Sequence, residues 1–370
     1  MKKFKIFSSK SFLSENGRHA QLLFPFWGLV QKKWVGPQQK RFDNWVKVGS
    51  DCFELSDIEN ADLCVYPGEY GDWALMKQQA VAFAELAKKH KKPAALFFFA
   101  DSAEPIEIEN CLVFRTSLDR STKASYEYVM PAWSEDFVEE YWDGKVVLRE
   151  KQTTPVVGFC GQPGPFSLSQ RAKSILRWAA RRALKYIGSR EKRAVIAKQD
   201  LEEGNYYGFH TSAIRSKALR VLMKSHRVVS NFQIFQGFYV LNSDEKQEQA
   251  RQNMLNNILE SDYILCVRGQ GNFSYRLYET LCSGRIPVFI DTDSELPFED
   301  QIDWRSIAVW VDQRDIERVG DKVAEFHDNL SPDEFNALQL KCRETWVEWL
   351  SPEGYFKKLK ESLEAGKISM

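Results

Sequence analysis

The sequence predicts an α/β fold made of two halves of similar size. Short apolar runs alternate along the chain with segments of helical period, which is the pattern of parallel sheets covered by helices. The length of 370 residues exceeds one ordinary hydrophobic core and fits two domains. We therefore expect an N-terminal domain over 1–150, a second domain over 151–335, and C-terminal helices over 336–370 that pack back on the first domain.

The first half contains one clear β-loop-α-β unit. The apolar runs 61–66 and 94–100 predict strands, and a third strand is expected over 112–115. Between the first two, 72–90 carries apolar residues at helical spacing and ends in lysines, as a helix C-terminus does. The stretch 120–150 has no strong period, so we expect it to connect the domains.

The second half repeats this alternation. A long helix is expected over 168–187, and 334–363 has a helical pattern rich in aromatic residues. The strand-like runs are 156–160, 263–267, 286–290 and 307–311. In open parallel sheets, ligands bind beyond the carboxyl ends of the strands. The candidate site is therefore formed by the loops that follow positions 66, 100, 160 and 267.

Charge and composition exclude several classes of protein. The 51 basic and 51 acidic residues leave no net charge, so we expect no nucleic-acid partner. No run approaches the roughly 18 apolar residues of a membrane span, and the N-terminus lacks the apolar run of a secretory signal. The seven cysteines show no CxxC spacing. We therefore expect free thiols in a reducing, cytoplasmic compartment, instead of disulfides or a zinc site.

One stretch, 263–298, combines the residues that bind phosphate groups. It has the order strand, glycine-containing loop, helix, turn and strand. Gly269 and Gly271 let the loop backbone approach a ligand closely because glycine has no side chain. Ser274 or Asn272 can cap the helix that follows, and the unpaired N–H groups at a helix start attract phosphate. We therefore expect a diphosphate to bind at this loop.

Two arginines and a glutamate accompany this loop. Arg276 falls in the first turn of the expected helix, where a cation opposes the helix dipole and has no local stabilising role. Arg268 ends the preceding strand, so both cations can clamp a diphosphate. Glu279 lies on the same helix face as Arg276 and can accept hydrogen bonds from ribose hydroxyls. Leu277 and Leu281 would face the core. The alternative interpretation is an exposed i,i+3 ion pair between Arg276 and Glu279, with glycines that only make turns.

Several short motifs follow one another in the second half of the chain. They are VVGFCGQ at 156–162, Arg171, Arg268-Gly, Arg276-Leu-Tyr-Glu279, Ser283-Gly-Arg-Ile-Pro-Val, Glu295-Leu-Pro-Phe and Ile302-Asp-Trp304. In this order they resemble the C-terminal half of exostosin-type glycosyltransferases, glycosyltransferase family 47, over roughly residues 155–312. The first half of the chain matches that family loosely.

The resemblance implies a GT-B fold, in which two Rossmann-like domains face each other across a cleft and the C-terminal one holds the nucleotide sugar. It implies an inverting, metal-independent transfer without a cofactor, usually from a UDP-sugar. The acceptor would be a glycan or lipid-linked glycan hydroxyl in surface polysaccharide synthesis. Many eukaryotic members have a membrane anchor and disulfides, neither of which this sequence indicates, so a cytoplasmic, bacterial form is expected.

Fixed cations must neutralise the diphosphate that departs in such a transfer. Besides Arg268 and Arg276, Arg171 is a candidate because it begins the helix after the Gly161 loop. The alternative for Arg171 is a place on a solvated basic face.

Inversion also needs a general base that takes the proton of the acceptor hydroxyl. Asp101 and Glu69 are the candidates because both lie in loops after strands of the first half. The alternative for each is a turn or helix-capping carboxylate. His210 is a further candidate, although a lone histidine beside aromatic residues is more often packed.

Two other patterns have structural interpretations beside functional ones. Asp291-Thr-Asp293 is formally a DxD, the metal signature of another glycosyltransferase fold, but Asp and Thr are also common turn residues. The segment Arg171–Arg193 carries nine Lys or Arg and one Glu. It predicts a domain helix with a basic solvated face, and docking to an anionic membrane is the alternative.

The sequence therefore predicts a glycosyltransferase whose partners are a nucleotide-sugar donor and a glycan acceptor. Peripheral association with an anionic inner membrane face is a further hypothesis. The alternatives are a non-catalytic nucleotide- or sugar-binding protein of the same fold and a metal-dependent DxD glycosyltransferase. A Rossmann-type oxidoreductase is disfavoured because no GxGxxG opens a βαβ unit.

Overall fold

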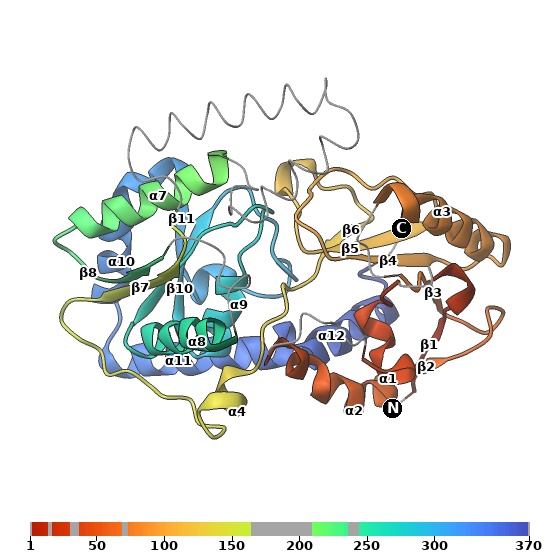
Figure 1. Ribbon diagram of the computed structural model, residues 1–370, viewed down its shortest axis with the longest axis horizontal. Helices are drawn as coiled ribbons and strands as arrows, with labels where there is room; N and C mark the ends of the chain where they lie inside the picture. The colour runs from red at the N-terminus through yellow and green to blue at the C-terminus, as the bar shows by residue number, and fades with distance from the viewer. Residues whose placement is uncertain are drawn as a thin grey trace.

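Two parallel sheets flanked by helices form the protein (Figure 1). The computed structural model describes residues 2–13, 17–29, 37–68, 73–163, 209–235 and 244–368. The predicted α/β class is confirmed, and the two sheet domains are consistent with the GT-B arrangement. Nowhere in these ranges does a helix have both the length and the apolar character of a membrane span.

The N-terminal sheet has six parallel strands in the order β2-β1-β3-β4-β5-β6. The strands are β1 (Phe4–Phe7), β2 (Phe53–Leu55), β3 (Leu63–Val65), β4 (Ala94–Phe98), β5 (Cys111–Arg115) and β6 (Glu127–Val129). The helices of this part are α1 (Phe24–Trp27), α2 (Asp43–Cys52), α3 (Trp73–Lys89) and α4 (Phe137–Tyr141).

Alternate residues of the strands reach two separate cores on the two faces of this sheet. On one face, Phe97 of β4 packs with Trp45 of α2 and Phe356 of a C-terminal helix. On the other face, Phe98 belongs to the cluster that Phe83 of α3 completes. Both faces are covered, as a parallel sheet requires, and this explains why β3 and β4 are continuous apolar runs.

The C-terminal sheet has five parallel strands in the order β11-β10-β9-β7-β8. They are β7 (Val156–Gly161), β8 (Val229–Ile234), β9 (Tyr263–Cys266), β10 (Ile286–Asp291) and β11 (Val309–Asp312). The helices are α7 (Phe209–Lys224), α8 (Asp244–Leu259), α9 (Tyr275–Cys282), α10 (Val319–Asp328), α11 (Pro332–Thr345) and α12 (Pro352–Glu364). Figure 1 shows α7 and α10 on one side of this sheet and α8 and α11 on the other.

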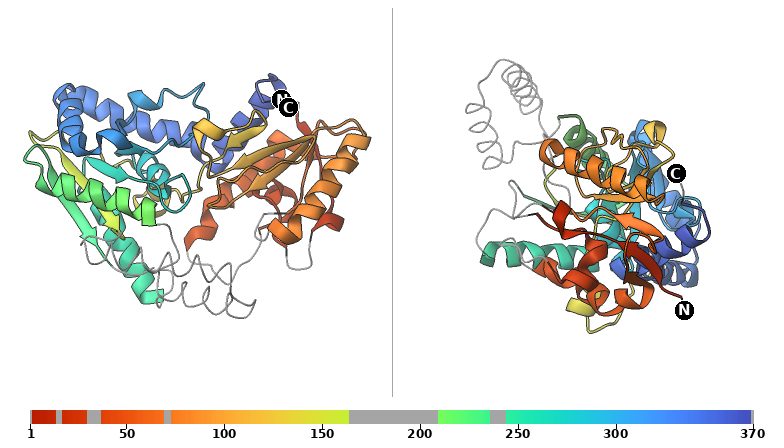
Figure 2. Two further views of the ribbon diagram at one scale, coloured as in Figure 1. Left: turned by 90° about the horizontal axis from the view of Figure 1, so that it is seen from above. Right: turned by 90° about the vertical axis from the view of Figure 1, so that its right-hand side faces the viewer.

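The C-terminal helices run from the second domain to the first (Figures 1 and 2). A π-helical turn, Trp346–Leu350, separates α11 from α12. Tyr355, Phe356 and Leu359 of α12 are buried in the core of the N-terminal sheet. A single chain segment thus contributes to both domains and restricts how they can separate.

All seven predicted strands are present, and the structure adds β1, β2, β6 and β8, which the sequence analysis does not predict. The stretch 120–150, expected to connect the domains, also contains the edge strand β6 and the short helix α4. A three-residue strand that pairs only with β5 is too short to show a hydrophobic period. The expected helix over 168–187 lies outside the described residues.

The predicted burial of three cysteines in apolar runs is confirmed. All seven thiols are free, and Cys64, Cys160 and Cys266 are buried, as their positions in apolar runs indicate. Burial raises the pKa of the Cys64 thiol to about 11, so it is a packing residue without nucleophilic character at neutral pH.

The loops at the carboxyl edges of the two sheets meet between the domains. Asp119, after β5, forms an antiparallel bridge with Ser294, after β10. The Arg120 guanidinium lies 3.3 Å from Asp291, 3.7 Å from Glu295 and 3.1 Å from Glu299. The ends of both sheets are therefore held face to face, which is the place where open α/β sheets bind ligands.

Candidate functional site

The centre of the candidate site is the switch point of the C-terminal sheet. From β7 the chain goes outward to β8, and it then returns past β7 to β9. The loops after β7 and β9 consequently diverge and leave a crevice at their carboxyl ends. Helix α9 begins at Tyr275, as predicted, after the loop that follows β9.

Arg276 and Glu279 lie in the first turns of α9. Their side chains form an ion pair of 2.9 Å, and each is 20% exposed. The Arg276 Nη2 also donates to the Cys160 backbone oxygen near the end of β7, at 3.0 Å. The i,i+3 pair of the alternative interpretation is therefore present, but it is largely buried and joined to the switch point. Leu277 and Leu281 are buried in the core, as predicted.

Arg215 of α7 ties the two loops together, and the sequence did not indicate it. Its Nη1 donates to the Gln162 backbone oxygen at 3.0 Å, and its Nη2 donates to the Arg268 backbone oxygen at 2.9 Å. Burial, with a smaller effect of the Arg276 charge, lowers the pKa of Arg215 to about 10. Each carbonyl is 53 residues away in sequence, so no local signal could have found this residue.

Arg268 is directed to the N-terminal domain. Its Nη2 donates to the Gln270 backbone oxygen at 3.1 Å. Burial lowers the pKa of Arg268, while the charges of Asp119 and Asp101 oppose that shift. Arg268 and Arg276 thus have different hydrogen-bond partners, and the diphosphate clamp formed by both remains a prediction.

Asp101, the base candidate, lies in the loop after β4 and faces the glycine loop of the second domain. Burial raises the pKa of its carboxyl, and a hydrogen bond from the Gly271 N–H and the charge of Arg268 lower it by less. A Cβ atom on Gly271 would lie 2.9 Å from the Asp101 Cα. Glycine is therefore required at position 271, because the two loop backbones touch there.

A buried arginine holds the Asp101 loop in place. Arg115, at the end of β5, pairs with Glu127 and donates to the backbone oxygens of Ser102 and Glu104, at 2.5 Å and 3.0 Å. The Thr116 hydroxyl donates to the Ala100 backbone oxygen at 3.1 Å. These contacts fix the loop on both sides of Asp101, as a catalytic carboxylate would require.

Asn272, predicted to bind the donor, joins the domains. It is fully buried, and its Nδ2 donates to Asp119 at 2.5 Å and to the Thr292 backbone oxygen at 3.1 Å. The Thr292 and Ser294 hydroxyls donate to its Oδ1. The backbone N–H of Asn272 also donates to the Ser117 hydroxyl. Because protein partners occupy the side-chain amide, the role of Asn272 is to position the glycine loop.

The remaining residues of the predicted loop have different local roles. Ser274 is the N-cap residue of α9, but its side chain makes no capping hydrogen bond. Gly269 has open space where a Cβ would lie, and its N–H bonds the Phe273 backbone oxygen. Gly161 is the last residue of β7 and accepts a hydrogen bond from Phe235.

The DxD residues belong to the domain interface. Asp291 accepts hydrogen bonds from Arg120 and from the Trp310 indole, at 3.3 Å and 3.2 Å. Asp293 has a positive φ of 65° and accepts a hydrogen bond from the Ser121 hydroxyl. In the described part of the chain, no three His, Cys, Asp or Glu side chains are grouped as metal ligands.

Three predicted residues cannot be placed in this site. Glu69 and Arg171 lie outside the described residues. His210 belongs to the start of α7, and its side chain lies outside the described part. Their roles remain predictions.

The C-terminal end of α9 is held by the connection between the domains. Arg343 of α11 pairs with Asp136 at 2.7 Å and donates to the Cys282 backbone oxygen at 3.0 Å. A cation at the last carbonyl groups of a helix is favourable. The helix that presents Arg276 is consequently fixed at both ends.

Comparison with known proteins agrees with the place of this site. Residues 204–326 match the Exostosin GT47 domain. The match includes Arg215, Arg268, Arg276 and Glu279. It covers the site residues on α7, the loop after β9 and α9, but neither the end of β7 nor any residue of the first domain.

Individual relatives align with parts of the chain that are shorter than this matched domain. Exostosin-1 of Drosophila melanogaster is 29% identical over 106 residues, which are 29% of this chain and 13% of that protein. A "probable glucuronosyltransferase" of Oryza sativa subsp. japonica is 44% identical over 59 residues, 16% of this chain and 14% of that protein. A "probable beta-1,4-xylosyltransferase" of Arabidopsis thaliana is 44% identical over 54 residues, 15% and 13% respectively. The aligned part of the chain thus spans about one-seventh of each relative's length.

Proposed function

We propose that the chain is an inverting, metal-independent glycosyltransferase that moves a sugar from UDP to a hydroxyl of a glycan. The observation that carries this proposal is Arg276 at the start of α9, joined to the end of β7, inside the segment similar to the Exostosin GT47 domain. The names of the relatives, glucuronosyl- and xylosyltransferases among them, support a glycan acceptor.

In the proposed mechanism, the acceptor oxygen attacks the anomeric carbon from the face opposite the diphosphate. The bond from that carbon to the phosphate oxygen breaks as the new glycosidic bond forms. The hydroxyl proton passes to the Asp101 carboxylate, and the diphosphate leaves with the electron pair. Arg276, Arg268 and the N–H groups at the start of α9 stabilise the negative charge that develops on the diphosphate. The two arginines thus replace the metal ion of metal-dependent glycosyltransferases. Glu279 binds the ribose hydroxyls.

Calorimetric titration with UDP tests the donor site. Replacement of Arg276 by Ala should weaken UDP binding about a hundredfold, which is about 2.7 kcal/mol, because a charge-assisted contact is lost. Arg314→Ala is the matched control, since Arg314 forms an exposed pair with Asp312. Equal UDP affinity in wild type and R276A would refute the donor assignment.

Assays of sugar transfer distinguish the alternatives. We expect transfer from one member of a panel of UDP-, GDP- and CMP-sugars, with full activity in EDTA. Strict dependence on Mn²⁺ would favour the DxD alternative. UDP binding with neither transfer nor donor hydrolysis would favour a non-catalytic binding protein.

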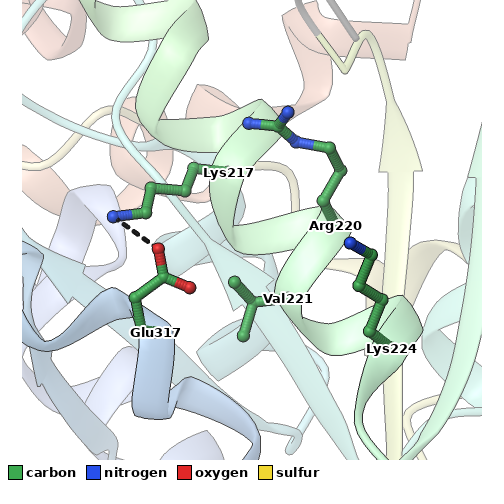
Figure 3. Close-up of a pocket in the computed structure, with 5 residues that line it drawn as sticks. All are labelled: Lys217, Arg220, Val221, Lys224 and Glu317. Atoms are coloured by element: carbon green, nitrogen blue, oxygen red, sulfur yellow. Dashed lines mark ion pairs between the residues drawn. The ribbon is translucent and has the colours of Figure 1, made fainter.

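The proposed place of action is the cytoplasm, at the inner face of a membrane. The seven free thiols support a reducing compartment. A hollow of about 480 Å³ on the second domain supports contact with anionic lipid (Figure 3). Lys217, Arg220 and Lys224 of α7 line it, together with Val221 and Glu317. Only Lys217 is paired with Glu317, at 2.8 Å, so the hollow keeps an excess of positive charge.

A further inference from the structure

An exposed aromatic side chain stands at the start of α9. Tyr275 has 41% of its surface exposed, and it is the one exposed aromatic residue in the part of the chain that the structure describes. The next residue is Arg276. Exposure of a large ring has a cost in free energy that burial against a ligand would remove.

Two further aromatic side chains adjoin Tyr275, one from each domain. The Phe273 ring centroid lies 5.4 Å from that of Tyr275, with an interplanar angle of 67°. Phe99, which follows β4, lies 6.4 Å away at 63°. Both contacts are edge-to-face, so neither neighbour is stacked on the Tyr275 ring. We call Phe99, Phe273 and Tyr275 the aromatic platform.

We propose that the aromatic platform binds a pyranose ring of the glycan acceptor. This inference rests on the proposed function, and it assigns the acceptor side of the same site. The apolar C–H face of a pyranose packs on an aromatic ring, while its hydroxyl groups stay available to polar partners at the rim. Asp101 is two residues after Phe99 and offers such a partner. The ring that carries the reacting hydroxyl must lie close to the base, and Phe99 of the platform belongs to the same loop as Asp101.

The direction of the side chains favours an acceptor sugar over the donor's uracil. Consecutive residues of a helix project about 100° apart. Arg276 is directed to the end of β7, whereas Tyr275 meets Phe99 of the N-terminal domain. A donor held by Arg276 therefore lies on the side of the second domain. The platform faces the N-terminal domain, on the acceptor side of the site.

Saturation-transfer NMR with three tetrasaccharides, of β-1,4-linked xylose, glucose and N-acetylglucosamine, tests the proposal on the full chain. The variants are Tyr275→Ala and Tyr275→Phe, and Leu340→Ala is the control because Leu340 of α11 is equally exposed at 42%. UDP affinity is measured by calorimetry on the same samples, and circular dichroism checks that each variant is folded.

We expect at least one tetrasaccharide to bind the wild type, with the strongest transfer to ring C–H protons. Y275A should weaken that binding about tenfold, while Y275F and L340A change it less than about twofold. UDP affinity should stay within about twofold in all three variants. A loss of UDP affinity in Y275A would assign the ring to the nucleobase and overturn the proposal. Unchanged tetrasaccharide binding in Y275A, or no binding to the wild type, would overturn it as well.

The same experiment separates this inference from the proposed function. If Y275A loses tetrasaccharide binding but the wild type never binds UDP, the platform stands as a sugar site and the glycosyltransferase proposal fails. If R276A loses UDP binding but Y275A binds the sugars normally, the donor site stands and the platform fails.

Discussion

Replacement of Arg215 by Met should impair UDP binding more than it impairs folding. Arg215 contacts the loops after β7 and β9 through the backbone oxygens of Gln162 and Arg268. Methionine has a similar length and fills the same space, but it cannot donate to either oxygen. The change therefore removes the connection between the two loops with little loss of packing.

The burial and the hydrogen bonds of Arg215 set the size of the effect on stability. The pKa of Arg215 falls from 12.5 to about 10, which at about 1.4 kcal/mol per pKa unit disfavours the buried cation by about 3 kcal/mol. Two hydrogen bonds from a charged group contribute about 1.5–3 kcal/mol each, or about 3–6 kcal/mol together. The hydrogen bonds offset the cost of burial, so the net contribution of Arg215 to the free energy of unfolding is about 0–3 kcal/mol. Its principal role is then to hold the two loops at a fixed distance, as the proposed diphosphate site requires.

Chemical denaturation and calorimetry with UDP measure the two effects. We expect the free energy of unfolding of R215M to lie within about 3 kcal/mol of the wild-type value. R215M should bind UDP at least about tenfold more weakly than wild type. R215K should bind UDP as weakly as R215M, because the two oxygens are contacted by two different guanidinium nitrogens, and the single nitrogen of a lysine cannot take both positions. K217A, two residues along α7, is the control and should match wild type in both measurements. UDP affinity equal to wild type in R215M, or a loss of stability above about 5 kcal/mol, would refute this reasoning.

Three further predictions concern the interface, the base and the basic hollow. Arg120→Ala should lower the free energy of unfolding by about 1–3 kcal/mol, discounted because Arg120 is 36% exposed, since Asp291 and Glu299 lose the guanidinium while Glu295 keeps Lys123. R314A should change the free energy of unfolding by less than about 0.5 kcal/mol in the same denaturation series. Burial raises the Asp101 pKa, so the acid limb of the pH–rate profile should lie above the ordinary aspartate value of about 3.9. D101N should abolish transfer while UDP affinity is retained. An unchanged transfer rate in D101N would exclude Asp101 as the base. The Asp101 contribution to the free energy of unfolding decreases with pH, whereas the transfer rate increases. A raised carboxyl pKa stabilises the fold at low pH, and this contribution is lost as pH rises through the raised value. Charge reversal of Arg220 and Lys224 to Glu should abolish sedimentation with phosphatidylglycerol vesicles while leaving UDP affinity intact, and equal sedimentation would refute the membrane contact.

Local chemistry explains which elements could be predicted. Runs such as 94–98 and 286–291 are buried on both faces of a parallel sheet, so they are apolar throughout and easily found. Turn residues and glycines mark their ends. The strands β6 and β8 have no such pattern, because β6 has only three residues and no residue of β8 is fully buried.

The site residues were predicted where a local rule was broken. Arg276 opposes the helix dipole, and this conflict pointed to a role beyond the helix. Asn272 was assigned to the donor site because it lies in the glycine loop and can cap the helix that follows, yet its amide donates to Asp119 and Thr292. A loop asparagine can serve a ligand or another loop with the same atoms, and only the neighbouring domain decides between them.

The sequence alone determined the α/β class, most of the strands, the start of α9 and the free thiols, because hydrophobic period, turn residues and cysteine spacing act over a few residues. The tertiary structure alone decided that Arg215 joins two loops, that Arg115 holds the Asp101 loop and that Tyr275 meets Phe99 between the domains. These contacts depend on the order of strands in each sheet and on the docking of one sheet edge against the other. Both are set by burial summed over the whole chain, and no short segment carries that information.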